Sequence, residues 1–234
     1  MRGCLSVVIL AIVFVATGTW LAGPAVAAFV IESGLSAAGF NGSNTSVTVT
    51  ADPPFEVLTG KVDRVDIESD DTKLDQFRAG KVELSLTDAN LLARTYATVT
   101  GGLDDVTVEG SGDLSLEAER VDLEGDPSSA DMTVEVTREA LSNAALDLFR
   151  QQLGVDVDTV KFAAPNKVAF TAGSTTIAGQ FVIHEGGLSM TVNLPGAERI
   201  DLLEAGRGFR LTKVAIDDDG MTLNGVLDVE RLLS

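Results

Sequence analysis

Val82-Glu83-Leu84-Ser85-Leu86 alternates apolar and polar side chains without a break. Because successive side chains of a β-strand point to opposite faces, this stretch predicts a strand with one apolar and one polar face. One dry and one wet face are typical of an antiparallel sheet. The same alternation recurs along the chain, at residues 47–50, 62–67, 106–109, 114–123, 132–136, 157–162, 168–170, 177–183, 188–192, 211–216 and 221–223.

Turn-forming residues separate several of these strands. Asn166 falls between two of them, and Glu185-Gly186-Gly187 and Asp217-Asp218-Asp219-Gly220 each connect a pair. Glycine, asparagine and aspartate favour the backbone conformations of tight turns. The last two stretches therefore predict β-hairpins.

Two longer helices are predicted among the strands, which makes the fold class α+β and mostly antiparallel. Thr137 can cap a helix over residues 138–153, and Gly154 would end it. A second helix is expected over residues 28–38, and a shorter one over residues 88–96. The apolar residues of the 138–153 helix fall on one face, namely Leu141, Ala145, Leu148 and Phe149.

The two longer helices have similar continuations. Each precedes a strand and then proline, Pro53-Pro54 in the first half and Pro165 in the second. Such a recurrence is consistent with an internal duplication in which each half lays one helix on a curved sheet. The apolar seam between helix and sheet either holds acyl chains or is closed by packing, and the sequence leaves both readings open.

The N-terminal segment is uniformly apolar. After Arg2 no charged residue follows until Glu32. Ala25-Val26-Ala27 matches the small-residue pattern of a secretory signal peptide cleaved after Ala27, while the length of the stretch equally suits an uncleaved membrane anchor. In both interpretations residues 1–27 form the signal or anchor, and residues 28–234 form one β-rich domain outside the cytoplasm.

Charge and cysteine content exclude several functions. The chain of 234 residues carries a formal net charge of −18. This acidity excludes nucleic-acid binding, which depends on cationic contacts with phosphates. Cys4, the only cysteine, lies in the apolar segment, so the domain has no disulfide, thiol nucleophile or cysteine metal ligand. No cofactor is indicated.

Catalytic groups are sparse. His184 is the only histidine, at the expected end of a strand, and without a G-x-S-x-G elbow a nucleophilic triad has no support. The acidic groups Asp70-Asp71, Asp104-Asp105 and Asp217-Asp218-Asp219 lack the spacing of an EF-hand and are interpreted as turn residues. We therefore do not expect an enzyme; hydrolysis by paired carboxylates is the alternative that an acidic chain leaves open.

The most distinctive stretch is Pro53–Ile67, which reads PPFEVLTGKVDRVDI. It resembles the signature of the LmeA-like family of bacterial envelope proteins, in which proline and phenylalanine precede a short apolar run, a glycine and a strand. Residues 208–225 resemble the closing hairpin of that family. The resemblance implies an extracytoplasmic cell-envelope protein, membrane-anchored or secreted, that binds phospholipid, with phosphoinositides the best-attested class.

The same resemblance implies a role in lipid transport or in the maintenance of envelope lipoglycans. It also implies a tubular fold, in which a long curved sheet wraps around one or two amphipathic helices. Residues 96–102 fit the family pattern poorly, and the acidity argues against a broad cationic surface for headgroups. A local pocket at Arg64, Arg120 or Arg207 is compatible with the sequence.

The pattern does not identify the residues that contact lipid, and the candidates are Phe55, Leu58, Leu148 and Phe149. For the family motif of Pro54, Phe55 and Gly60 we favour a structural interpretation over ligand contact: the proline sets an extended backbone, Phe55 fills the core and Gly60 permits a turn. The competing function is a structural or adhesive envelope domain with a closed core and no ligand.

Overall fold

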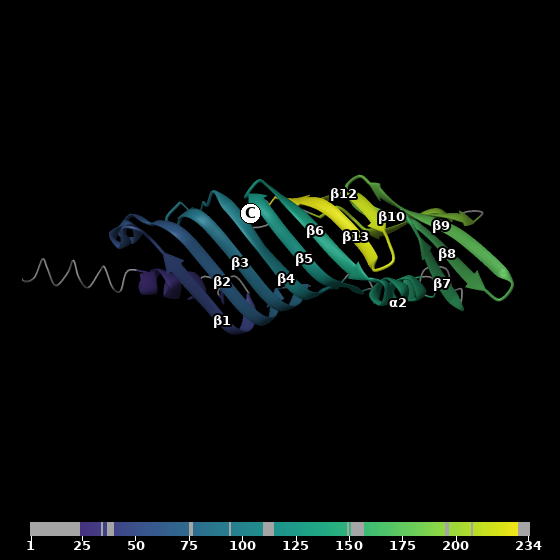
Figure 1. The fold of residues 1–234 in the computed structure, drawn as a ribbon, viewed down its shortest axis with the longest axis horizontal. Coiled ribbons are helices and arrows are strands. Elements are labelled where there is room, and N and C mark those ends of the chain that lie inside the picture. Colours follow the sequence, from purple (N-terminus) through teal and green to yellow (C-terminus); the bar gives the residue numbers. More distant parts are fainter. Residues whose placement is uncertain are drawn as a thin grey trace, which may run out of the picture.

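Two antiparallel β-sheets build an elongated molecule in the computed structural model (Figure 1). The structure describes residues 24–33, 35–36, 40–74, 77–93, 95–109, 115–148, 150, 157–194, 197–206 and 208–228. The larger sheet has eight strands in the order β1-β2-β3-β4-β5-β6-β13-β12, and the smaller has five in the order β11-β10-β9-β8-β7. The predicted fold class, mostly antiparallel β, is confirmed.

The larger sheet consists of β1 (Asn41–Thr50), β2 (Lys61–Leu74), β3 (Phe77–Asn90), β4 (Thr98–Glu109), β5 (Ser115–Asp126), β6 (Ser129–Thr137), β12 (Phe209–Ile216) and β13 (Gly220–Leu227). The smaller sheet consists of β7 (Thr159–Ala163), β8 (Lys167–Ala172), β9 (Thr175–His184), β10 (Gly187–Leu194) and β11 (Ala197–Leu203). The helical elements are residues 24–33 and 35–36, the 3-10 helix η1 (Pro54–Thr59) and α2 (Arg138–Leu148).

The strands predicted from alternation are confirmed. The 3-10 helix η1 was not predicted, the helix expected over residues 28–38 is already helical at residue 24, and two further elements differ from the prediction. β11 was not expected, because only Ile200 and Leu202 alternate before a second leucine breaks its pattern. The predicted helix over residues 88–96 is wrong. β3 runs on to Asn90, which exchanges backbone hydrogen bonds of 2.7 and 3.2 Å with Thr95 and so closes a tight turn.

The helix that follows β6 begins as predicted. The backbone N–H of Ala140 donates to Thr137 Oγ1 at 3.2 Å, which is the expected N-terminal cap. Leu141 and Ala145 are buried on its inner face. The structure places α2 as far as Leu148, while Phe149 and the predicted terminator Gly154 lie outside the described residues.

Both predicted hairpins are confirmed. Between β9 and β10, Glu185 and Gly186 have φ angles of 50° and 83°, the left-handed conformations of a tight turn. Between β12 and β13, Asp217 Oδ1 accepts hydrogen bonds from the N–H groups of Asp219 and Gly220 at 2.9 and 3.1 Å. The acidic group of residues 217–219 is therefore a turn, as the sequence predicted.

The other acidic pairs lie at bends inside strands, so their interpretation as turn residues is wrong. In β2, Ser69 and Thr72 are both buried, and Asp70-Asp71 between them lies on the outer side of the sheet. Asp104-Asp105 occupies the equivalent place in β4. The second residue of each pair has φ of 46° or 52°, a left-handed conformation that aspartate tolerates. An extra outward residue of this kind is a β-bulge, which changes the direction of the following side chains and bends the strand.

Two apolar clusters lie on one face of the larger sheet. The first joins α2 and the smaller sheet to β3–β6, β12 and β13, with Val82, Leu141 and Phe170 among its buried members. The second joins helical residues 24–33 and 35–36 to β1–β3, and both Ala27 and Val65 are buried in it. Leu84 packs against both clusters, so the apolar face is continuous from one to the other.

The edge strand β12 ties the two sheets together. The N–H of Leu211 donates to the carbonyl oxygen of Gly186 at 2.8 Å, and the N–H of Ile216 donates to that of Pro165 at 2.6 Å. Both sheets are open, and the wrapping of a sheet around a helix and the internal duplication stay predictions. Within the described ranges, no helix has the length and apolar character needed to cross a bilayer.

Candidate functional site

Mostly apolar residues form two rows across the larger sheet. Residues that pair directly across antiparallel strands share one face of the sheet. One row consists of Ile67, Leu84, Gly101, Leu123, Met132, Gly225 and Leu211. The next row consists of Ser69, Val82, Leu103, Val121, Val134, Leu223 and Val214. Together they form one apolar face that runs from β2 to β12.

The middle of this face is incompletely covered. At its ends, Ile67 on β2 and Leu211 on β12 are only 7% and 2% exposed. Between them, on β3 to β6, long apolar side chains are half-buried. We call these residues the apolar strip: Leu84, Leu103, Leu123, Met132 and Val134. The strip takes Leu84, Leu123 and Met132 from the first row and Leu103 and Val134 from the second, where Val82 and Val121 are buried. Half-covered apolar side chains grouped on one face are the kind of surface that an apolar ligand completes.

Glycine interrupts the first row beside the apolar strip. A Cβ atom on Gly101 would lie 2.1 Å from the carbonyl oxygen of Glu83 and 2.9 Å from Leu84 Cα, so no side chain fits there. Leu84 and Leu123 are the direct neighbours of Gly101 on the two adjoining strands. Leu84 Cδ2 would also lie 2.9 Å from that Cβ atom, so the backbone and side chain of β3 already occupy the space beside Gly101.

Of the four residues predicted to contact lipid, Phe55 and Leu58 lie outside the apolar strip. Phe55 and Leu58 are on η1, with 54% and 65% of their surface exposed, so the interpretation that Phe55 fills the core is wrong. Leu148 is the last residue of α2, and Phe149 lies outside the described residues. A role of these four residues in lipid contact stays a prediction.

The remaining motif residues act as the sequence predicted. Pro54 is the first residue of η1, after an extended Pro53 with φ −80° and ψ 146°. Gly60 ends η1 with φ +80°, and its N–H bonds the carbonyl oxygens of Glu56 and Val57. A Cβ atom at this position would lie 2.6 Å from Leu92 Cγ. Glycine is therefore needed both for the turn and for the close approach of residue 92.

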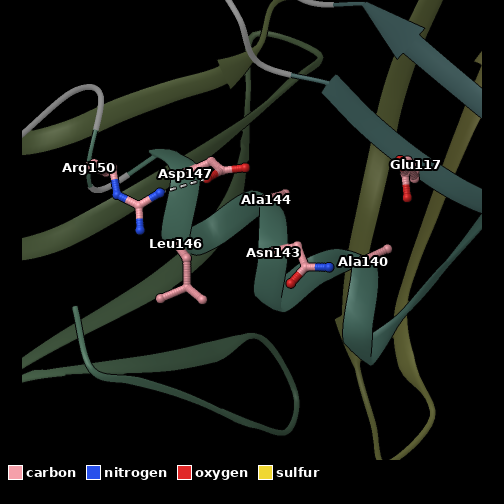
Figure 2. Close-up of a pocket in the computed structure, with 7 residues that line it drawn as sticks. All are labelled: Glu117, Ala140, Asn143, Ala144, Leu146, Asp147 and Arg150. Carbon is pink, nitrogen blue, oxygen red and sulfur yellow. Dashed lines mark hydrogen bonds and ion pairs between the residues drawn. The ribbon is translucent and has the colours of Figure 1, made fainter. Parts of the chain in front are cut away.

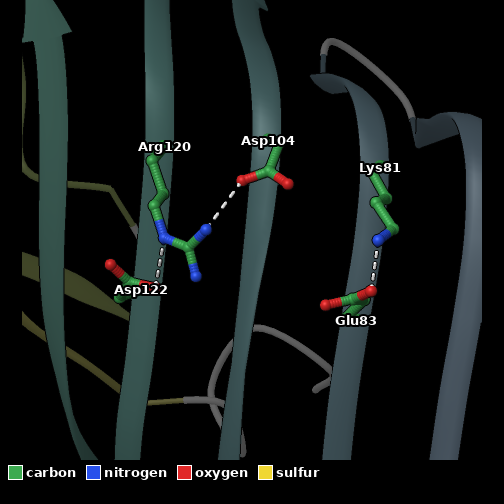
Figure 3. A network of polar contacts seen from close by, with 5 residues as sticks. All are labelled: Lys81, Glu83, Asp104, Arg120 and Asp122. Atoms are coloured by element: carbon green, nitrogen blue, oxygen red, sulfur yellow. Dashed lines mark hydrogen bonds and ion pairs between the residues drawn. The ribbon is translucent and has the colours of Figure 1, made fainter.

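The arginines proposed for a headgroup pocket are engaged by carboxylates. Arg64 Nε lies 2.7 Å from Asp66 Oδ1. Arg120 contacts Asp122 Oδ1 through Nε at 2.8 Å and Asp104 Oδ1 through Nη1 at 3.2 Å (Figure 3). Arg207 lies outside the described residues. The described arginines thus already have the anionic partners that a phosphate would otherwise supply.

Arg120 belongs to a ladder of alternating charges on the outer side of the sheet. Direct cross-strand pairs connect Asp70, Lys81, Asp104, Arg120 and Glu135, from β2 to β6. The hydrogen bond to Asp122 and the charges of Asp122 and Asp104 raise the pKa of Arg120 above its usual value. The hydrogen bond to Glu83, and then its charge, raise the pKa of Lys81. Opposite charges on adjoining strands favour this register over its alternatives.

Arg120→Gln is expected to lower the urea midpoint of unfolding, because the carboxylates of Asp104 and Asp122 then face each other without a cation. The loss should shrink at high salt, since exposed charges are screened. Arg64→Gln is the matched control, because Arg64 bonds a carboxylate on its own strand and should have a smaller effect. Equal losses at low and high salt for Arg120→Gln would contradict the account of the ladder.

Two hollows in the surface are lined mainly by polar groups. One of about 490 Å³ lies beside the charge ladder, with Glu83, Arg120, Asp122 and Glu124 in its lining. The other, of about 370 Å³, lies along α2, where Arg150 Nη1 is 3.4 Å from Asp147 Oδ1 (Figure 2). The carboxylates in the lining of the first do not suit a phosphate group.

His184 has the placement that the sequence predicted. It is the last residue of β9, and its Nε2 lies 3.8 Å from the carboxylate of the exposed Glu185. In the part of the chain that the structure describes, no group of three histidine, cysteine, aspartate or glutamate side chains is arranged to hold a metal ion.

Comparison with known proteins matches nearly the whole chain to one family. A family model described as LmeA-like phospholipid-binding matches residues 18–226. No curated protein and no solved structure matches the chain. The matched range contains the helical residues 24–33, η1, α2 and all strands of the apolar face except the last residue of β13.

Proposed function

The chain belongs to the LmeA-like phospholipid-binding family, and on this premise we propose that it holds a phospholipid with its acyl chains along the apolar strip. The observation that carries the proposal is the group of half-buried apolar side chains on one face of β3–β6. In this role the protein is a binding protein rather than an enzyme. The bound lipid covers the apolar strip and is released without chemical change.

The dimensions and chemistry of the strip support this role. Neighbouring strands lie about 4.8 Å apart, so the distance from β3 to β6 is about 14 Å, enough for a substantial part of an acyl chain. Each methylene group removed from water contributes about 0.8 kcal/mol. Leu84, Leu123 and Met132 lie in one row across β3, β5 and β6, with Gly101 of β4 between the two leucines.

The headgroup preference is tested by uptake from vesicles. The full chain is delipidated in detergent, exposed in turn to phosphatidylinositol, phosphatidylglycerol and phosphatidylcholine, and analysed by native mass spectrometry. We expect uptake of one phospholipid, with phosphatidylinositol preferred as the family resemblance implies. Absence of uptake from every vesicle type would overturn the proposal and favour a structural envelope domain with a closed core.

We further propose that the protein works outside the cytoplasm, in the cell envelope, where a lipid carrier or a lipoglycan-maintenance factor would meet its lipid. The absence of charge between Arg2 and Glu32 supports export. Helical residues 24–33 run through Ala25-Val26-Ala27, and Ala27 is 6% exposed within the second cluster. Cleavage after Ala27 would remove a packed residue, which favours a retained membrane anchor over a cleaved signal peptide.

The retained anchor predicts the mass of the mature protein. Intact-mass analysis of protein purified from its own membranes should give a chain that still contains residues 1–27, because the helix protects the Ala27–Ala28 bond from a protease that needs extended backbone. A protein whose first residue is Ala28 would contradict this prediction. The uptake experiment above is independent of that outcome.

A further inference from the structure

Large apolar side chains are exposed at one end of the molecule. They come from helical residues 24–33, from η1 and from the turn at residues 91–93, and between 54% and 76% of the surface of each is exposed. Figure 1 places the helix at the end of the molecule opposite β8 and β9. We call this group the apolar tip: Val26, Phe29, Val30, Phe55, Leu58 and Leu92.

Packing beneath the surface brings these segments together. Ala27, Val57 and Leu91, one from each segment, belong to or pack against the second cluster. The N–H of Leu91 donates to the carbonyl oxygen of Gly60 at 2.7 Å, which joins the turn to the end of η1. The apolar tip is therefore a built surface, made from parts of the chain that are distant in sequence.

The helix in the apolar tip is apolar on both sides. Ala27 and Ile31 face the sheet, whereas Val26, Phe29 and Val30 point away from it. Spacings of three and four residues place these three outer side chains on one stripe. A helix that is apolar all round is normally buried on all sides. The outer stripe thus requires an apolar partner.

The chain that precedes this helix identifies the partner. Between Arg2 and Pro24 the sequence has no charged residue, and its length is that of a segment able to enter the hydrocarbon of a bilayer. It joins the apolar tip directly at Pro24, so any bilayer that holds the segment lies against the tip. The net charge of −18 opposes attraction to anionic headgroups, which leaves apolar insertion as the means of contact.

We propose that the apolar tip docks into a lipid bilayer, with η1 and the turn at residues 91–93 at the boundary between headgroups and acyl chains. This contact goes beyond a tether, because Phe55, Leu58 and Leu92 belong to the folded domain. A tether alone would leave these side chains in water at a variable distance from the membrane. Docking holds the domain in one orientation, with β8 and β9 directed away from the bilayer.

Docking also connects the bilayer with the apolar strip. Val57 and Leu91, which underlie the tip, pack against the same cluster as Leu84 and Leu86. The tip and the strip therefore border the same apolar cluster, in which Val62, Val65 and Ile67 are buried. This connection rests on the proposed lipid binding, whereas docking itself does not.

The test uses the full chain with Cys4→Ser, reconstituted into phosphatidylcholine vesicles with and without nitroxide-labelled lipid. Leu58→Cys and Leu92→Cys each introduce a single site for an environment-sensitive fluorophore. Ser174→Cys, in the exposed turn between β8 and β9, is the matched control at the opposite end. We expect blue-shifted emission and loss of most of the emission with nitroxide lipid at positions 58 and 92, and neither change at position 174.

Two outcomes would overturn the docking proposal. The first is that the nitroxide lipid does not quench the emission at positions 58 and 92, although the protein floats with the vesicles. This result would mean that the N-terminal segment tethers the domain without docking. A blue shift that disappears on dilution of the protein and is insensitive to nitroxide would mean that a second copy covers the tip.

Repeating the measurement in a Leu123→Asn/Met132→Asn background separates docking from lipid held on the strip. Quenching without uptake would refute the proposed function alone, and uptake without quenching would refute docking alone.

Discussion

Leu123→Asn/Met132→Asn is expected to weaken phospholipid uptake roughly a hundredfold, from a loss of about 3 kcal/mol of apolar contact. The two residues pair directly across β5 and β6 in the middle of the apolar strip, and both are half-buried. Asparagine presents an amide that an acyl chain cannot satisfy. The measurement is uptake by the delipidated full chain from vesicles, followed by native mass spectrometry.

The adjoining pair on the same strands provides the control. Glu124 and Asp131 also pair directly across β5 and β6, but they lie on the outer face and are exposed. Glu124→Asn/Asp131→Asn should leave uptake unchanged, although it alters the same two strands by the same number of residues. Equal loss of uptake in both double variants would show that the face of the sheet is irrelevant, and would contradict placement of the lipid on the strip.

Gly101→Val is expected to cause a large loss of stability, about 3 kcal/mol. The reason is the position of the missing Cβ atom, 2.1 Å from the backbone oxygen of Glu83. Backbone in the centre of an eight-stranded sheet cannot retreat without breaking its pairing. Urea unfolding followed by circular dichroism gives the midpoint, which should fall well below that of the unchanged protein.

Gly102→Ala is the matched control for this substitution. Its Cβ atom would meet Arg120 Nη2 at 2.9 Å, which is the far end of a flexible side chain and can move aside. A small change in the urea midpoint is therefore expected. If the urea midpoint of Gly101→Val falls no further than that of Gly102→Ala, the backbone of β3 does not lie as close to residue 101 as described.

Most of the strands could be predicted from the alternation of apolar and polar residues. In an antiparallel sheet with one buried face, alternate residues of each strand face the core and the solvent. The bends were harder to predict. Asp70-Asp71 and Asp104-Asp105 read as turn signals, since aspartate favours left-handed backbone. The structure uses that preference inside β2 and β4 instead. Local propensity alone does not distinguish a turn from a bend when the strand continues on both sides.

The apolar strip could not be found from the sequence. Leu84, Leu123 and Met132 look like ordinary inward residues of separate strands, and only the cross-strand register places them in one row. Phe55 was predicted to fill the core because aromatic side chains are usually buried, yet it is exposed on η1. Its neighbour Leu58 is exposed as well, and this recurrence at a spacing of three residues was the available signal for a surface stripe.

The central claim is that phospholipid occupies the apolar strip, and the most direct test is the lipid content of the natural protein. The full chain is purified from its own membranes in mild detergent and analysed by native mass spectrometry, with extraction and identification of any bound lipid. We expect one phospholipid per chain, retained in Glu124→Asn/Asp131→Asn and lost in Leu123→Asn/Met132→Asn. A mass without lipid, together with no uptake from vesicles, would contradict the claim and identify the protein as a structural domain of the envelope.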